Sequence, residues 1–131
     1  LQKNCSDYID LFLIHWPVPG YFVQTYKILE ELVREGKIRS LGLSNFSEAE
    51  YEELIEGGTT VAPVVNQFEV SPFMYRPELL QYFVDKSVVV GSSKSLHRAD
   101  CLDHPTISSI ALRHGKTSAQ VMLRWSYQHD M

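Results

Sequence analysis

The 131-residue sequence predicts an α/β protein in which about four consecutive βα units with parallel strands form part of a (β/α)8 barrel. Short apolar runs alternate with amphipathic segments at helical spacing, which is typical of parallel strands joined by right-handed crossovers. The units recur roughly every 25–30 residues, and a full barrel needs eight of them and about 250 residues. We therefore expect one domain, residues 1–131, that is an internal fragment of a barrel without its N-terminal strands and its closing C-terminal segment.

The first unit starts with the apolar run Ile9–Ile14, which is followed by His15, Trp16 and Pro17. The run has the length of a strand, and its near-continuous apolar character predicts burial on both faces. Pro17 cannot donate a ladder hydrogen bond, so we expect the strand to end there. Gly36 is placed to end the next helix in a left-handed conformation. The apolar stripe of that helix consists of Phe22, Tyr26, Leu29 and Val33.

The second and third units follow the same plan. A strand is expected at Ser40–Ser44, and Ser47 with Glu50 forms a capping box for a helix that runs to about Ile55. The third strand is expected within residues 62–70, with Val64 and Val65 buried. The next helix begins at Pro77 and has an apolar stripe of Leu79, Leu80, Phe83 and Val84.

The fourth strand is expected at Val88–Val90, and a polar loop then runs to about His104. A helix begins at Pro105, and a left-handed Gly115 ends it. A second capping box, Thr117 with Gln120, starts a last helix. The residues of the two helices that should face the interior are Ile107, Ile110, Ala111, Val121, Met122 and Trp125.

Composition narrows the partners and the compartment. The formal net charge of −4 does not favour nucleic acid as a partner, and no apolar run approaches the length of a membrane span. Cys5 and Cys101 fit no metal or redox spacing, so we expect two free thiols in a reducing compartment, the cytoplasm. The other histidines show no metal-ligand spacing, and no metal is expected. The oligomeric state stays open.

Four polar clusters follow the four predicted strands: His15-Trp16, Ser44-Asn45, Gln67 with Glu69, and Ser92-Ser93-Lys94. Because the carboxyl ends of parallel strands meet at one edge, these clusters should converge on one mouth. Each cluster also has an ordinary structural explanation. A strand-end histidine or tryptophan is often structural, Ser-Asn is common in turns, and a loop lysine is often only solvated. No glycine-rich phosphate loop or GxSxG elbow is present.

Four motifs in this order resemble the aldo-keto reductases: DYIDLFLIHWP, EGKIRSLGLSNF, APVVNQFEVSPF and GKTSAQVMLRW. The resemblance covers almost the whole chain. It implies a (β/α)8 barrel that reduces aldehydes or ketones with NADPH, the small-molecule carbonyl being its partner. His15 matches the family's active-site histidine, and Trp16 matches an aromatic wall of the substrate pocket. Ser44, Asn45 and Gln67 match the residues that hydrogen-bond the nicotinamide carboxamide.

The sequence also departs from the family pattern. Ser93 occupies the position of an aromatic residue that stacks on the nicotinamide ring, and serine cannot stack. Lys94 could approach the cofactor diphosphate, or it could be an ordinary loop lysine. The family's catalytic Asp, Tyr and Lys have no match in this chain, so we expect it to be inactive alone. The alternative function is a non-catalytic barrel remnant or a module that binds a cofactor or a partner. Trp16 and Phe73 indicate an apolar pocket wall.

Overall fold

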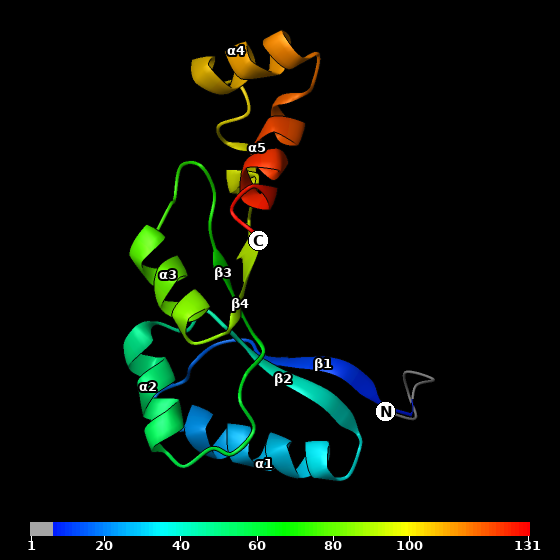
Figure 1. Ribbon diagram of the computed structural model, residues 1–131, viewed down its shortest axis with the longest axis vertical. Helices are drawn as coiled ribbons and strands as arrows, with labels where there is room; N and C mark the ends of the chain where they lie inside the picture. Colours follow the sequence, from blue (N-terminus) through cyan, green and yellow to red (C-terminus); the bar gives the residue numbers. More distant parts are fainter. Residues whose placement is uncertain (1–6) are drawn as a thin grey trace.

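The computed structural model describes residues 7–131 and contains a four-stranded parallel sheet in the order β1-β2-β3-β4 (Figure 1). The strands are β1 (Ile9–Ile14), β2 (Ile38–Ser44), β3 (Val65–Glu69) and β4 (Val89–Ser93). The helices are α1 (Phe22–Arg34), α2 (Glu48–Glu56), α3 (Pro77–Asp85), α4 (Pro105–His114) and α5 (Ser118–Tyr127). Parallel strands alternating with helices confirm the predicted α/β class.

The helix ends form where the sequence places them. Gly36 has φ +71°, and its N–H donates to the carbonyl of Val33 over 2.9 Å, which closes α1. Ser47 and Glu50 form the reciprocal capping box at the start of α2. Thr117 and Gln120 do the same for α5, and Gly115 ends α4 with φ +59°.

Two strands differ in extent from the prediction. β2 begins at Ile38 rather than Ser40, because Ile38 pairs with Ile9 of β1. β4 begins one residue later than predicted and continues to Ser93. This extension follows from pairing with β3, since Glu69 lies opposite Ser93 in the parallel register. Strand pairing therefore overrides the low strand propensity of Gly-Ser-Ser.

The core lies between the sheet and helices α1, α2 and α3, which lie one after another on one face of the sheet (Figure 1). Phe83 of α3 connects the layers, with ring centroids 6.0 Å from Phe68 of β3 and 5.5 Å from Tyr51 of α2. Leu41 and Leu43 of β2 are fully buried. These contacts place the carboxyl ends of the strands on a packed support.

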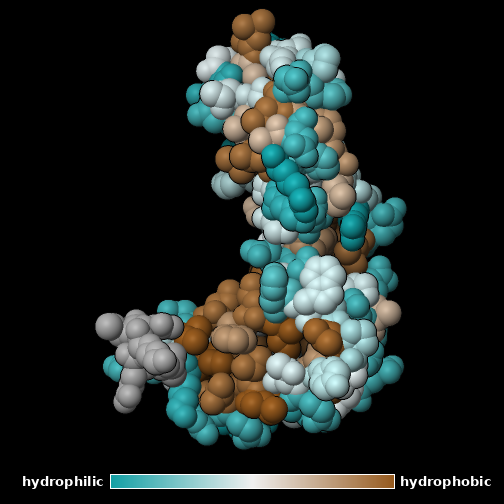
Figure 2. Space-filling view, turned by 180° about the vertical axis from the view of Figure 1, so that it is seen from behind, coloured by the Kyte–Doolittle hydropathy of each residue, from teal (hydrophilic) through white to brown (hydrophobic). Residues whose placement is uncertain are grey.

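Several burial predictions are wrong because one face of the sheet is open and β1 lies at its edge. Leu11 of β1 is on the open face and is 44% exposed, whereas Phe12, which pairs with the buried Leu41 on the helix-covered face, is still 37% exposed. Val64, just before β3, is also exposed. Within β3 the half-buried Val65 and the exposed Gln67 alternate with Asn66 and Phe68, which face the helices and are buried. Figure 2 shows apolar side chains gathered over the lower part of the molecule, where β1 and β2 lie in Figure 1.

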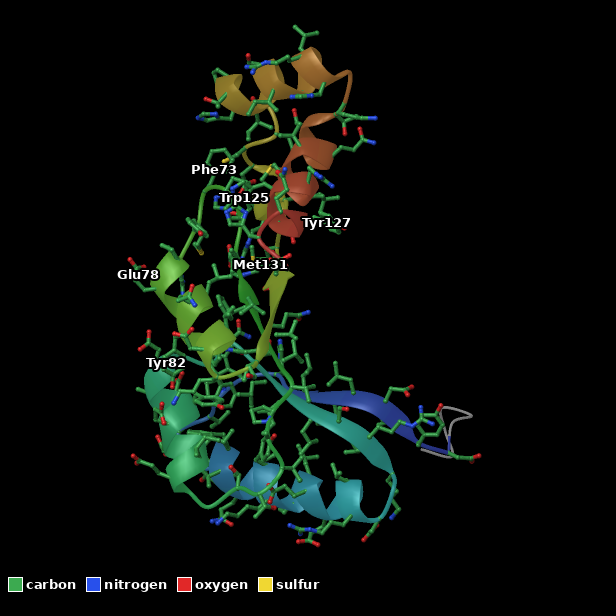
Figure 3. The ribbon with its side chains drawn as sticks, in the orientation of Figure 1. Phe73, Glu78, Tyr82, Trp125, Tyr127 and Met131 are labelled. Atoms are coloured by element: carbon green, nitrogen blue, oxygen red, sulfur yellow. The ribbon has the colours of Figure 1, made fainter. Side chains whose placement is uncertain are left out.

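Hydrogen bonds from helices fix the loops and neighbouring helices. The buried Glu30 carboxylate of α1 accepts from the backbone N–H groups of Thr60 and Val61, at 2.6 and 2.7 Å, just before β3. Tyr82 of α3, labelled in Figure 3, donates its hydroxyl hydrogen to Glu52 of α2 over 2.5 Å. Desolvation and this bond raise the pKa of Tyr82.

The predicted apolar stripe of α3 is wrong at one position, because Val84 is exposed.

Helices α4 and α5 pack on each other beyond the end of the sheet (Figure 1). Ile107, Ala111 and Met122 are buried there as predicted, but they lie outside the main core cluster. Trp125 is half-buried against that cluster, and its ring lies 5.2 Å from Tyr75 in the loop before α3 (Figure 3). Within residues 7–131, none of the helices has the length and apolar composition needed to cross a bilayer.

Candidate active site

The structure brings the four polar clusters to one edge of the sheet, the edge at which all four strands end. Ser44 lies opposite Gln67 in the pairing of β2 with β3, and Glu69 lies opposite Ser93 in the pairing of β3 with β4. His15 directly follows β1, and Lys94 directly follows β4. The predicted convergence of strand-end polar residues is therefore present in the fold.

Asn45 connects three of these strands. Its φ of +64° turns the chain sharply after β2, and asparagine is one of the few residues that tolerate this conformation. The backbone N–H of Asn45 donates to the carbonyl of Gln67 over 2.9 Å. Its side-chain Nδ2 donates to the carbonyl of His15 over 2.9 Å and to Ser44 Oγ over 3.0 Å. Asn45 thus holds the end of β1 against the ends of β2 and β3.

The remaining hydrogen-bonding capacity of this group fits a carboxamide. Ser44 Oγ donates to the carbonyl of Gln67 over 2.9 Å and keeps one acceptor lone pair. Both Nδ2 hydrogens of Asn45 are used, which leaves its Oδ1 as an acceptor. The exposed Gln67 side chain makes no hydrogen bond to any other residue of the described 7–131, so it offers a donor and an acceptor. The two acceptors, Ser44 Oγ and Asn45 Oδ1, match the NH2 of a carboxamide, and the Gln67 amide offers a donor for its C=O.

His15 and Trp16 are exposed at the end of β1, and the Trp16 side chain is 59% exposed. Trp16 and Asn45 line a cavity of about 230 Å³, together with Phe68, Arg76, Lys94 and four other residues. Three of the predicted site residues, Trp16, Asn45 and Lys94, therefore share one cavity. The imidazole of His15 makes no hydrogen bond within the described part of the chain, so it is available to a ligand.

Lys94 forms an ion pair with Glu69 across the ends of β3 and β4. Hydrogen bonding to the Lys94 ammonium lowers the pKa of the Glu69 carboxyl below its ordinary value, and the positive charges of Lys94 and Arg98 act in the same direction. Lys94 itself has φ +52°, so the chain turns sharply at this point. Ser93 ends β4, and its carbonyl accepts from Val70 N–H over 3.3 Å.

Sequence reasoning missed how the loop after β4 is held. His97, Arg98 and Ala99 all have positive φ and form a left-handed turn. His97 Nδ1 lies 3.2 Å from the hydroxyl of Ser71, which is fully buried after β3. Phe73 packs against His97 and His104 of this loop, with ring centroids 5.6 and 5.1 Å apart, and does not line the cavity beside Trp16. Consecutive left-handed residues without glycine have no sequence signal.

Cys101 is a half-buried free thiol, and Cys5 lies outside the described residues. Among residues 7–131, no group of three or more His, Cys, Asp or Glu side chains is arranged to hold a metal ion.

A family model described as the aldo/keto reductase family matches residues 1–99. The chain is 37% identical over 131 residues to the uncharacterized oxidoreductase YtbE of Bacillus subtilis strain 168, covering 46% of that protein. It is 39% identical over 131 residues to the glyoxal reductase of the same strain, covering 47% of that protein. The chain thus spans about half the length of the curated relatives it matches.

Solved structures agree with this match. An aldo/keto reductase from Brucella melitensis superposes with a TM-score of 0.91 at 37% identity, covering 99% of this chain and 50% of that one. A Gox0644 mutant solved in complex with NADPH superposes with a TM-score of 0.88 at 36% identity, covering 93% of this chain and 45% of that one. With its strand-end polar edge and parallel βα units, the chain belongs to the aldo/keto reductase family.

Proposed function

We propose that this chain takes part in the NADPH-dependent reduction of aldehydes or ketones to alcohols. The observation that carries the proposal is the unused hydrogen-bonding capacity of Ser44, Asn45 and Gln67 at one edge of the sheet. The Gox0644 complex with NADPH and the relative named glyoxal reductase support the cofactor and the carbonyl substrate. NADPH, when bound, supplies the hydride.

Each residue then has a distinct part. Ser44, Asn45 and Gln67 hold the nicotinamide carboxamide and so fix which face of the ring meets the substrate, which is catalysis by positioning. The imidazole of His15 donates a hydrogen bond to the carbonyl oxygen, where negative charge grows during reduction. Trp16 provides a wall for the substrate. Because Asn45 bonds the backbone of His15, the carbonyl-facing and nicotinamide-facing residues are fixed relative to each other.

Ser93 favours a second candidate, a module that binds the cofactor without catalysing its oxidation. Its hydroxymethyl group offers no ring to stack on a nicotinamide, so the hydrogen bonds of the carboxamide would have to place the ring alone. Mixing the chain with NADPH and an aldehyde and following NADPH absorbance tests the second candidate, because turnover would reject a module that only binds. Absence of turnover is expected of both candidates, since the family's catalytic Asp, Tyr and Lys have no match in this chain.

The test of the proposed function is a titration with NADPH that follows the fluorescence of Trp16 and Trp125. We expect saturable quenching, weakened about twofold to tenfold in Gln67→Ala because one charge-neutral hydrogen-bonding group is worth about 0.5–1.5 kcal/mol. Gln24→Ala on the exposed side of α1 is the matched control and should bind like the unchanged chain. Equal affinity of Gln67→Ala and Gln24→Ala would contradict the assignment of Gln67.

A further inference from the structure

The cavity beside Trp16 is lined by an arginine whose guanidinium forms no ion pair within residues 7–131. Arg76 directly precedes α3 and is exposed, and it lines the same cavity as Trp16 and Asn45. Within residues 7–131 it has no carboxylate at ion-pair distance, and its guanidinium contacts only the Met74 sulfur, at 3.9 Å. A guanidinium has five N–H donors, and a thioether sulfur is a weak acceptor, so its donors are available to a ligand.

The charges that line the cavity select the kind of ligand. Lys94 and Glu69 neutralise each other in an ion pair, which leaves Arg76 as the excess charge of +1 among the lining residues. A single positive charge matches a monoanion better than a phosphate, which carries a charge near −2 at neutral pH. The planar fork of a guanidinium also matches the two oxygens of a carboxylate.

The shape of the cavity points the same way. Its volume of about 230 Å³ lies below the roughly 300–1,000 Å³ typical of sites that enclose drug-sized ligands. Trp16 supplies an aromatic wall, and the buried Phe68 with the half-buried Leu79 supplies apolar surface. Such a site accepts a small molecule with an apolar body and one charged end.

We propose that this cavity binds a carboxylate through Arg76, with the apolar part of the same molecule against Trp16. The cavity adjoins the backbone of His15, because the side chain of Asn45, which lines the cavity, donates to the His15 carbonyl over 2.9 Å. The His15 side chain is not among the residues that line the cavity. The ligand class is therefore small carboxylates with an apolar body, and carboxylate binding is independent of the proposed reductase function.

The experiment uses benzoate as the probe and benzamide as its neutral counterpart of nearly the same shape. Trp125→Phe leaves Trp16 as the only tryptophan of the chain, so fluorescence then reports on the cavity. We expect saturable quenching by benzoate, at least about tenfold weaker binding of benzamide, and about tenfold weaker benzoate binding in Arg76→Gln. Arg113→Gln, which changes an exposed arginine of α4, should bind benzoate normally.

Trp125→Phe is used only if its circular dichroism matches that of the unchanged chain. If it does not, calorimetric titration of benzoate into the unchanged chain and into Arg76→Gln gives the same comparison. Equal binding of benzoate and benzamide, or benzoate binding that Arg76→Gln leaves unchanged, would overturn the proposal. Displacement of benzoate by NADPH would also overturn it, because the anion site would then belong to the cofactor. Arg76-dependent benzoate binding in a chain that fails to bind NADPH would keep the carboxylate site and reject the reductase function.

Discussion

At the scale of single residues, the candidate site contains side chains that hold the fold together and still keep unused hydrogen-bonding capacity. Asn45 is the clearest example, since it occupies a left-handed conformation, bonds the end of β1 and still presents a free Oδ1. Glu69 and Lys94 show the opposite case, in which two strand-end charges neutralise each other. The charge left over at the edge therefore depends on pairing as well as on composition.

Asn45→Ala should lower the free energy of unfolding by about 2 kcal/mol. The substitution removes the hydrogen bond to His15, worth about 1 kcal/mol, and places a Cβ-bearing residue without a local partner at positive φ, which costs about 1–2 kcal/mol. Asn45→Gly loses the same hydrogen bond without this strain, so about 1 kcal/mol is expected. Urea denaturation followed by circular dichroism compares them, and equal losses would reject the role of the left-handed conformation.

Lys94→Met should raise the pKa of Glu69 toward its ordinary value. In the unchanged chain the lowered pKa means that the ion pair stabilises the fold above the pKa of the unfolded carboxyl. This contribution is lost as the pH falls through the lowered pKa of the folded state. Titration of the Glu69 carboxyl carbon by NMR measures both values, and the same midpoint in the two proteins would show that Lys94 does not hold the carboxylate.

At the scale of secondary-structure elements, side chains of the neighbouring strands occupy the space over a glycine in β2. A Cβ built on Gly42 would lie 2.4 Å from Leu13 Cδ2 of β1 and 2.5 Å from Val65 Cγ1 of β3. On Gly91 of β4 the nearest atoms, those of Gln67, would lie at an ordinary 3.5 Å. Two glycines on the same face of one sheet therefore differ in the space that they leave for a Cβ atom.

Gly42→Ala should cost about 1–3 kcal/mol of unfolding free energy, because the added methyl group overpacks a site between three strands. Gly91→Ala is the matched control and should change it by no more than about 0.5 kcal/mol. Thermal or urea unfolding of the two variants checks this difference. A Gly91→Ala variant as unstable as Gly42→Ala would show that the side chains packed over Gly42 are not the cause.

The same scale shows what the sequence could predict. Capping boxes at Ser47 and Thr117 and the left-handed Gly36 and Gly115 marked helix ends correctly, because these signals are local. The ends of β2 and β4 depended on pairing with another strand, which local pattern does not contain. The strand-end polar clusters were predictable from periodicity, whereas Arg76 and the turn at residues 97–99 depend on three-dimensional neighbours.

At the scale of the whole molecule, one face of the sheet is covered by helices and the other is open. This explains why apolar residues such as Leu11 and Val89 are exposed, at 44% and 62%, although their sequence pattern predicts burial. The chain spans about half the length of the curated relatives it matches, and its four βα units are half of the eight that a full barrel contains. The polar edge nevertheless forms within these four units, because β1 to β4 are neighbours in order.

The measurement that tests the central claim most directly follows the side-chain amide signals of Asn45 and Gln67 in ¹⁵N–¹H NMR spectra of the chain. One titration uses NADPH, and the other uses 2′-phospho-ADP-ribose, which is the same molecule without the nicotinamide. We predict that both amide signals shift with NADPH and stay in place with the ribose derivative, because these side chains hold the carboxamide. Equal shifts with the two ligands, or shifts only elsewhere in the chain, would contradict the account.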